Sequence, residues 1–341
     1  MTDETSANAL PASELALARA RLYELLGEIF ANGVTISNLS FVQSIEELNT
    51  AIPEPFDPDA AAAAHYEIFE HQVPPYESIF VGESGLIGGA PSDRVRDTFH
   101  LIGFDGISNQ RNCDHVSQLF TALGFLCRRR QDQIVRGQSD DPELTRGFHA
   151  LFYEHLLLWF HSLALAVIEQ GDPFYSHVVI LALELVETHS REIETETFRQ
   201  REGHSSLPVV SEPASKVGPD IDVENDVVAT HELIEQLIRP SGCGFYFTRK
   251  LIQDLGRMIS LPRGFTSRET MLQNLFQSAE KFESRKELVL KLDGFCKTAG
   301  KYYASRFDSR PHLKICLSGR IEALERTRKM LKRFDAQRPA Q

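Results

Sequence analysis

The side chains best suited to chemistry are the twelve histidines and the acidic residues near them. The candidates for metal binding or acid–base catalysis in the first half of the chain are His65, His71, His100, His115, His149, His155 and His161. Ligands on one helix must lie three or four residues apart, and His155 has no histidine at that distance. The chain also lacks an H-E-x-x-H motif and a repeated E-x-x-H pair. The sequence therefore predicts no metal site.

The glycine-rich stretch 82–89 has enough glycine to suggest a phosphate-binding loop. It lacks the Lys-Ser/Thr ending of a P-loop, and no strand signal precedes it. The chain has no G-x-S-x-G elbow to present a nucleophile. No part of the sequence combines a nucleophile, a base and an orienting group. We therefore predict that the protein is not an enzyme and carries no cofactor.

The cysteines and the N-terminus indicate a protein of the cytoplasm. The five cysteines, Cys113, Cys127, Cys243, Cys296 and Cys316, are far apart and odd in number, which predicts reduced thiols. The first residues are acidic, unlike the start of a secretory signal peptide. The longest apolar run, from Leu156 to Ile168, is shorter than the roughly 20 residues that a membrane span needs. We expect no stable membrane insertion.

The charge of the chain limits its partners. The net charge is −12, which opposes binding to nucleic acid and suits a basic partner. The last part of the chain differs, because residues 298–341 contain eleven Lys or Arg and four Asp or Glu. An acidic body followed by a basic last helix is therefore expected.

Helix signals recur along the chain, and strand signals are scarce. Three Asp-Pro pairs, at 57–58, 141–142 and 172–173, have the form of an N-cap followed by proline at the first helical position. Capping boxes are expected at Ser44–Glu47 and Thr266–Glu269. The most apolar helix is expected from Glu154 to Glu169, in the centre of a bundle. The predicted fold class is all-α.

The helical pattern stops between about residues 191 and 229. That stretch contains nine acids, four bases and several Pro and Gly residues, which is typical of a linker or long loop. We therefore predict a first helical domain at 10–190, a linker at 191–229, and a second helical domain at 230–337.

Three short strings in the first domain remain to be explained. Residues 74–80 read Pro-Pro-Tyr-Glu-Ser-Ile-Phe, and residues 113–116 read Cys-Asp-His-Val at the expected start of a long helix. Residues 154–160 read Glu-His-Leu-Leu-Leu-Trp-Phe, and Pro-Phe-Tyr follows at 173–175. An acid at a helix start is often only a cap, and Trp159 and Phe174 are expected in the core.

In this order and spacing, the strings resemble those of the TorD/DmsD/NarJ family of redox-enzyme maturation chaperones. The resemblance covers about residues 15–190, so the second domain lies outside it. The sequence departs from the family pattern at Arg111-Asn112, where Glu-Pro is usual, and at Leu158, where proline is usual. The resemblance implies an all-helical chaperone that binds the twin-arginine signal peptide or the apo form of a molybdopterin-dependent oxidoreductase. Such a client is a catalytic subunit of the DMSO-reductase type, held until its cofactor is inserted and it can be exported.

A twin-arginine leader needs carboxylates for its guanidinium groups and an apolar groove for its apolar stretch. We expect Tyr76 and Phe80 to make the apolar and stacking contacts, and Glu77 and Asp114 to bind the arginines. His115 would orient Asp114 or contact the peptide backbone. The acidic body would accelerate encounter with a basic peptide.

Two other functions are compatible with the sequence. A NarJ-like chaperone would act on the folded or apo subunit of a client that has no exported leader. Alternatively, a non-catalytic helical scaffold or regulator would bind an acidic partner through the basic last helix.

Overall fold

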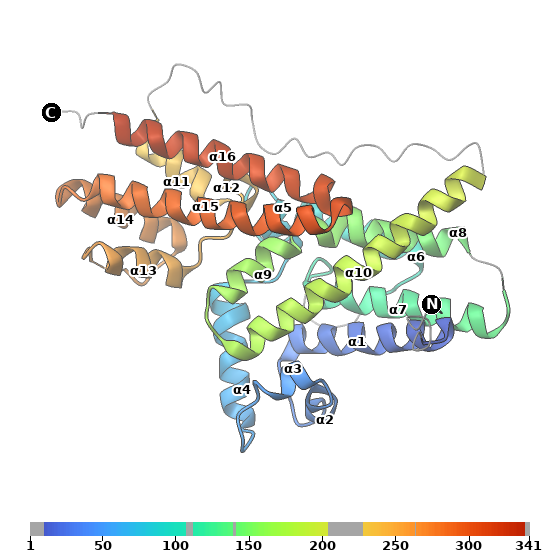
Figure 1. The fold of residues 1–341 in the computed structure, drawn as a ribbon. Coiled ribbons are helices and arrows are strands. Elements are labelled where there is room, and N and C mark those ends of the chain that lie inside the picture. The colour runs from blue at the N-terminus through green and yellow to red at the C-terminus, as the bar shows by residue number, and fades with distance from the viewer. Residues whose placement is uncertain (1–9, 107–111, 139–140, 204–227, 263, 338–341) are drawn as a thin grey trace, which may run out of the picture.

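The computed structural model describes residues 10–106, 112–138, 141–203, 228–262 and 264–337. Within these ranges the chain forms sixteen α-helices and no strand (Figure 1). An isolated antiparallel bridge joins Tyr76 to His115. The predicted all-α class is confirmed.

Residues 10–203 form what we call the first helical group. It consists of α1 (Ala12–Asn32), α2 (Leu39–Gln43), α3 (Glu46–Asn49), α4 (Pro58–His65), the π-helix η2 (Tyr66–Gln72), α5 (Glu77–Val81), α6 (Ala90–Ile102), α7 (Val116–Val135), α8 (Pro142–His149), the π-helix η3 (Ala150–His155), the 3-10 turn η4 (Leu156–Leu158), α9 (Phe160–Ile168) and α10 (Pro173–Gly203).

Residues 228–337 form the second helical group. It consists of α11 (Thr230–Ile238), α12 (Pro240–Cys243), α13 (Arg249–Met258), α14 (Arg268–Lys281), α15 (Arg285–Ser309), the 3-10 turn η5 (Pro311–Leu313) and α16 (Lys314–Ala336). Helices α15 and α16 form a long antiparallel pair (Figure 1).

Helices α1 and α7 pack side by side at short range in the first group (Figure 1). A Cβ atom added at Gly27 would lie 2.8 Å from the Thr121 hydroxyl, and one at Gly124 would lie 3.0 Å from the Glu24 side chain. Glycine at these positions therefore lets the two backbones approach closely. Their buried aromatic residues, including Phe30 and Phe120, meet in the core with ring centroids 5.5 Å apart.

The apolar stretch expected as one helix from Glu154 to Glu169 is broken in the structure. The π-helix η3 and the turn η4 precede Trp159, and α9 begins only at Phe160. The break leaves the carbonyl oxygen of Leu158 without a helical partner, and Arg320 of α16 donates to it at 2.8 Å. The expectation of a central position is confirmed for α9, since Phe160 to Val167 are all buried.

Helix α10 continues to Gly203, beyond the boundary expected at residue 191. Ion pairs hold this extension on its neighbours, with Glu192 2.7 Å from Arg19 of α1 and Glu196 2.7 Å from Arg130 of α7. Two of the acids that suggested a linker therefore bind neighbouring helices from α10. The rest of the expected linker, residues 204–227, lies outside the described residues.

The predicted helix caps have mixed outcomes. Asp57 and Asp141 cap α4 and α8 as expected. The capping box at Ser44 is wrong, because this residue ends α2 and donates to the Phe41 carbonyl. The box at Thr266 is also wrong, since Ser267 caps α14 by accepting from the backbone N–H of Thr270.

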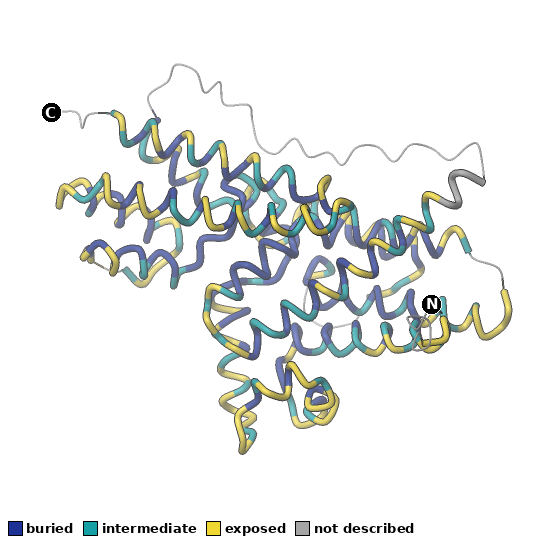
Figure 2. Tube along the Cα trace, in the orientation of Figure 1, coloured by how far each residue is buried: buried dark blue, intermediate teal, exposed yellow. Residues whose placement is uncertain are grey.

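The hydrophobic core extends through both helical groups (Figure 2). Helix α12 packs against α5, and α16 packs against η4. We call the whole contact region between the two helical groups the seam. A division into two domains that fold separately stays a prediction.

No single described helix is both long and apolar enough to cross a bilayer. By length and composition alone, the segments Pro142–Leu158 and Phe160–Ile168 meet the requirement together, with a bend of 44° between them.

Candidate functional site

The strings at 74–80 and 113–116 are joined by backbone hydrogen bonds. The N–H of Glu77 donates to the Asp114 carbonyl at 3.0 Å, and the N–H of Val116 donates to the Pro75 carbonyl at 2.9 Å. Proline has no N–H to continue a helix, so the chain becomes extended at Pro74–Pro75 and can pair with the segment before α7. We call the region where these strings meet the motif junction.

Asp114 lies at the centre of the motif junction and is fully buried. Its Oδ2 atom accepts from the backbone N–H of Ser78 at 3.0 Å, so this carboxylate caps α5 and not the helix that follows it. Its Oδ1 atom has no hydrogen-bond partner within the described residues. A buried carboxylate oxygen without a partner is costly, and it offers an acceptor to an incoming donor.

His115 is the N-cap of α7. Its Nδ1 atom accepts from the backbone N–H of Ser117 at 3.2 Å. Its ring also packs edge-to-face on the ring of Tyr76, with centroids 4.7 Å apart. His115 therefore holds Tyr76 and the start of α7 together.

The third string contributes His155 to the same junction. Its Nδ1 atom lies 3.1 Å from a carboxylate oxygen of Glu77, and its Nε2 atom lies 2.8 Å from the hydroxyl of Thr98. All three side chains are buried. Burial raises the pKa of Glu77, and the nearby charge of Asp114 raises it further, against the opposing effect of His155.

Phe80 lies on the side of the junction that faces the second helical group. Its ring stacks on Trp159 at 5.3 Å and lies 5.3 Å from the ring of Tyr246. Trp159 and Phe174 are buried, as expected for core residues. The indole N–H of Trp159 has no partner within the described residues.

The structure thus brings together all the residues proposed from the sequence as client contacts. Tyr76, Glu77, Phe80, Asp114 and His115 lie in one region, and all are buried, with Tyr76 the most accessible at 9 %. In this conformation they bind one another and the protein backbone. Their role as client contacts stays a prediction.

Sequence reasoning missed His155 and Thr98. His155 has no histidine at helical spacing, and its partner in the structure, Glu77, is 78 residues away in the chain. No local pattern signals a pair so distant in sequence.

A second buried cluster lies on the seam and was also missed. Glu187 of α10 is fully buried, and its carboxylate lies 3.0 Å from His161 of α9. From α15, Arg306 approaches the same carboxylate at 3.4 Å, and Arg310 from just beyond α15 at 2.9 Å. Burial alone would raise the pKa of Glu187, but the hydrogen bond and charge of His161 with both arginines outweigh it and lower the pKa.

Arg320 makes further polar contacts across the seam. It is buried, and its guanidinium group donates to the carbonyl oxygens of Phe80 at 3.1 Å, Leu158 at 2.8 Å and Pro240 at 2.9 Å. Burial without a carboxylate partner lowers its pKa. One side chain of α16 therefore joins two of the motif strings to α12.

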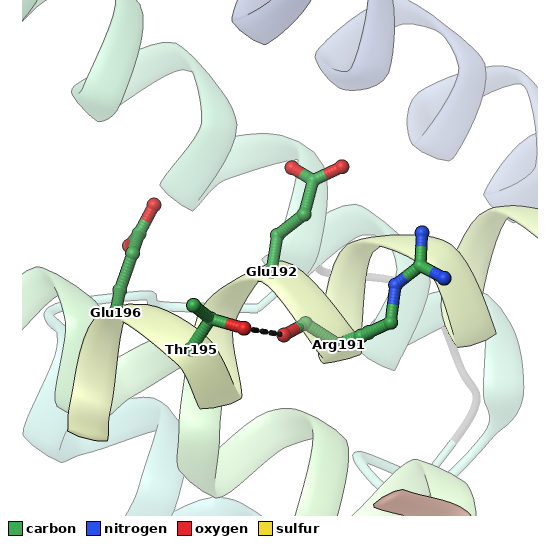
Figure 3. A pocket seen from close by; sticks show the side chains of 4 residues that line it. All are labelled: Arg191, Glu192, Thr195 and Glu196. Atoms are coloured by element: carbon green, nitrogen blue, oxygen red, sulfur yellow. Dashed lines mark hydrogen bonds between the residues drawn. The ribbon is translucent and has the colours of Figure 1, made fainter. Parts of the chain in front are cut away.

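A surface depression of about 280 Å³ lies on α10, away from the junction (Figure 3). It is lined by Arg191, Glu192, Thr195 and Glu196. Both glutamates already pair with arginines of α1 and α7, so this depression has little to offer a ligand. Within the described residues, no group of three or more His, Cys, Asp or Glu side chains is placed to hold a metal ion.

Comparison with known proteins gives one finding. Residues 40–164 match the sequence model of the family described as nitrate reductase delta subunit. The matched range contains the strings at 74–80, 113–116 and 154–160, and it ends before the second helical group. No curated protein and no solved structure matches the chain significantly.

Proposed function

Residues 40–164 form a domain of the nitrate reductase delta subunit family, of the NarJ/TorD type, whose members are non-catalytic chaperones of molybdoenzyme assembly; from this premise we propose how the chain serves its client. It binds the leader or the apo form of a molybdopterin-dependent catalytic subunit of the DMSO-reductase type. It holds this subunit in the cytoplasm while the cofactor is inserted, before export.

The observation that supports leader binding is the convergence of three distant strings on one region that combines carboxylates with aromatic rings. Asp114 supplies a carboxylate oxygen without a partner in the described residues, and Phe80 and Trp159 supply an apolar platform. A guanidinium group of the leader fits the Asp114 carboxylate, and the apolar stretch of the leader fits the rings of Phe80 and Trp159. In this proposal Tyr76 and Phe80 contact the apolar stretch, Glu77 and Asp114 bind the arginines, and His115 positions Asp114.

Calorimetry at low salt with a synthetic twin-arginine leader of the client tests this proposal. We expect saturable binding that weakens as salt is added, because part of the attraction is electrostatic. The double variant Glu77→Gln, Asp114→Asn should bind more weakly while its helical circular-dichroism signal is unchanged. Absence of binding by the unmodified protein contradicts leader recognition, and loss of helicity in the variant would assign these residues to the fold.

A second candidate is supported by the description of the matched family, which is named for a subunit of nitrate reductase. In that case the chain binds the apo subunit of a client that has no exported leader. Co-purification of the chain with a client whose leader has been deleted would favour this function, and dependence of capture on the leader would favour the first.

A further inference from the structure

Four residues of the stretch 241–250, namely Ser241, Tyr246, Arg249 and Lys250, contact the first helical group next to the motif junction. This stretch begins in α12, passes through the irregular residues 244–248 and enters α13. Residues 243–248 are all buried, although they belong to neither a long helix nor a strand. We call residues 241–250 the covering segment.

Four residues of the covering segment contact the first group. The Tyr246 ring lies on Phe80, and the Ser241 hydroxyl donates to the carbonyl of Gly82 at 3.2 Å. Arg249 donates to the carbonyl of His71. Lys250 donates through its backbone N–H to Gln72 at 3.1 Å and through its ammonium group to the Glu169 carbonyl at 3.3 Å.

Most side-chain hydrogen bonds across the seam have a common direction. An exception is Ser162, which donates to the Tyr303 hydroxyl at 2.9 Å because that hydroxyl donates to the Gly244 carbonyl. The side chains of Ser241, Arg249, Lys250, Arg306 and Arg320 donate, and groups of the first helical group accept. The accepting groups are mainly backbone carbonyls at the C-terminal ends of α5, η2, η4 and α9, with the carboxylate of Glu187. The first group therefore presents aromatic rings surrounded by acceptors. Such a surface fits an apolar segment that carries cationic donors.

The covering segment has that chemistry. It contains the aromatic run Phe245–Phe247, followed after Thr248 by Arg249 and Lys250. Gly244 makes the approach possible, because its φ of +88° is left-handed and a Cβ there would lie 2.6 Å from the Arg320 carbonyl. The segment is thus shaped to reach the acceptor surface while α16 packs behind it.

We propose that the covering segment occupies a client-binding surface of the first helical group, and that an apolar client segment bearing arginine displaces it. This inference rests on the proposed function, and it adds the backbone carbonyls of Phe80 and Gly82 to the carboxylates as acceptors for the client's arginine. The second helical group then regulates access: the client binds only in the fraction of molecules in which the covering segment is released. Apparent affinity falls in proportion to that fraction.

The test compares two variants of the full chain. Tyr246→Ala, Arg249→Ala removes the ring and the guanidinium group from the covering segment. The matched control, Arg257→Ala, Phe282→Ala, removes the same kinds of side chain from exposed positions of the second group, where Arg257 pairs with Asp254 on its own helix. The probe is a fluorescent synthetic peptide with two adjacent arginines before a leucine- and alanine-rich stretch, and the readout is its dissociation constant by anisotropy.

We expect the cover variant to bind the probe about tenfold more tightly than the unmodified chain, and the control to bind like the unmodified chain. Equal or weaker binding by the cover variant overturns the inference and leaves the proposed function intact. A measurement that needs no variant supports the result: an excess of a synthetic peptide of residues 240–251 should compete with the probe for the unmodified chain, and a scrambled peptide should not. Failure to compete also overturns the inference.

Failure of the proposed function is recognised separately. If no form of the chain binds the probe, leader recognition is contradicted. Hydrogen exchange then tests whether the covering segment can be released. Backbone amides of residues 77–82 should exchange faster in the cover variant than in the control. Equal exchange rates would show that residues 241–250 do not act as a releasable cover.

Discussion

Two buried glutamate–histidine pairs lie in the part of the chain that the structure describes, in different settings. Glu77 and His155 belong to the motif junction, where a carboxylate oxygen of Glu77 lies 3.1 Å from Nδ1 of His155. The other ring nitrogen of His155 contacts the neutral hydroxyl of Thr98. Glu187 and His161 belong to the seam, where Arg306 and Arg310 also contact the carboxylate. The same chemical pair therefore has a raised carboxyl pKa in one place and a lowered one in the other.

Both carboxylates are buried, so the number of cationic partners decides how a buried carboxylate affects the stability of the folded protein. A buried charge with little compensation costs stability, whereas one with several partners holds elements together. The seam cluster joins two helical groups that are far apart in sequence. The motif junction joins strings within the family domain and leaves Asp114 with an acceptor to spare.

The largest expected loss of stability comes from a substitution at the seam. Glu187→Gln leaves Arg306 and Arg310 without their carboxylate, and we expect the free energy of unfolding to fall by about 3 kcal/mol. Urea unfolding followed by circular dichroism measures this loss. The matched control is Glu184→Gln on the same helix, an exposed residue for which less than about 0.5 kcal/mol is expected. A loss no larger than that of the control would contradict the role given to the cluster.

A smaller effect is expected at the motif junction. Glu77→Gln keeps an oxygen that can accept from His155 and removes a poorly compensated buried charge, so the expected loss is about 1 kcal/mol or less. The same urea experiment checks it. A loss as large as that of Glu187→Gln would break the contrast between the two pairs.

The smallest effect is the pH dependence of each pair. The lowered pKa of Glu187 means that its stabilisation is complete above the ordinary value of 4.5 and is lost as pH falls below it. The raised pKa of Glu77 has the opposite sign: the folded state binds the extra proton, so stability decreases as pH rises from 4.5 through the raised value. We therefore measure the urea midpoint of unfolding at several pH values in this range. Glu187→Gln should abolish the loss of stability at low pH, and Glu77→Gln should abolish the loss of stability as pH rises.

Part of this fold is readable from the sequence because the signals are local. Asp57-Pro58 and Asp141-Pro142 predict two helix starts correctly, since an N-cap and the proline after it act within one turn. The burial of α9 follows from its uniform apolar character. The break before Trp159 does not, because its stability depends on Arg320, which is more than 160 residues away in the chain.

The candidate site shows the same limit. The strings around Tyr76 and Asp114 identify the family domain, and the structure does bring them together. Their burial could not be foreseen, because an acid and a tyrosine after two prolines look equally suited to a surface. The prediction that residues 191–203 belong to a linker is wrong for a related reason. The arginines that pair with acids of this stretch, Arg19 and Arg130, are far away in the sequence.

By itself, the sequence determined the helical class, several helix starts, and the motif strings that mark a maturation chaperone. These properties depend on backbone propensity and on residue spacing within a few turns. Tertiary structure alone decided which glutamate meets which histidine, where Arg320 finds its carbonyls, and that residues 241–250 lie on the motif strings. Such pairings depend on how packed helices bring distant segments within hydrogen-bond range, and no local period records that distance.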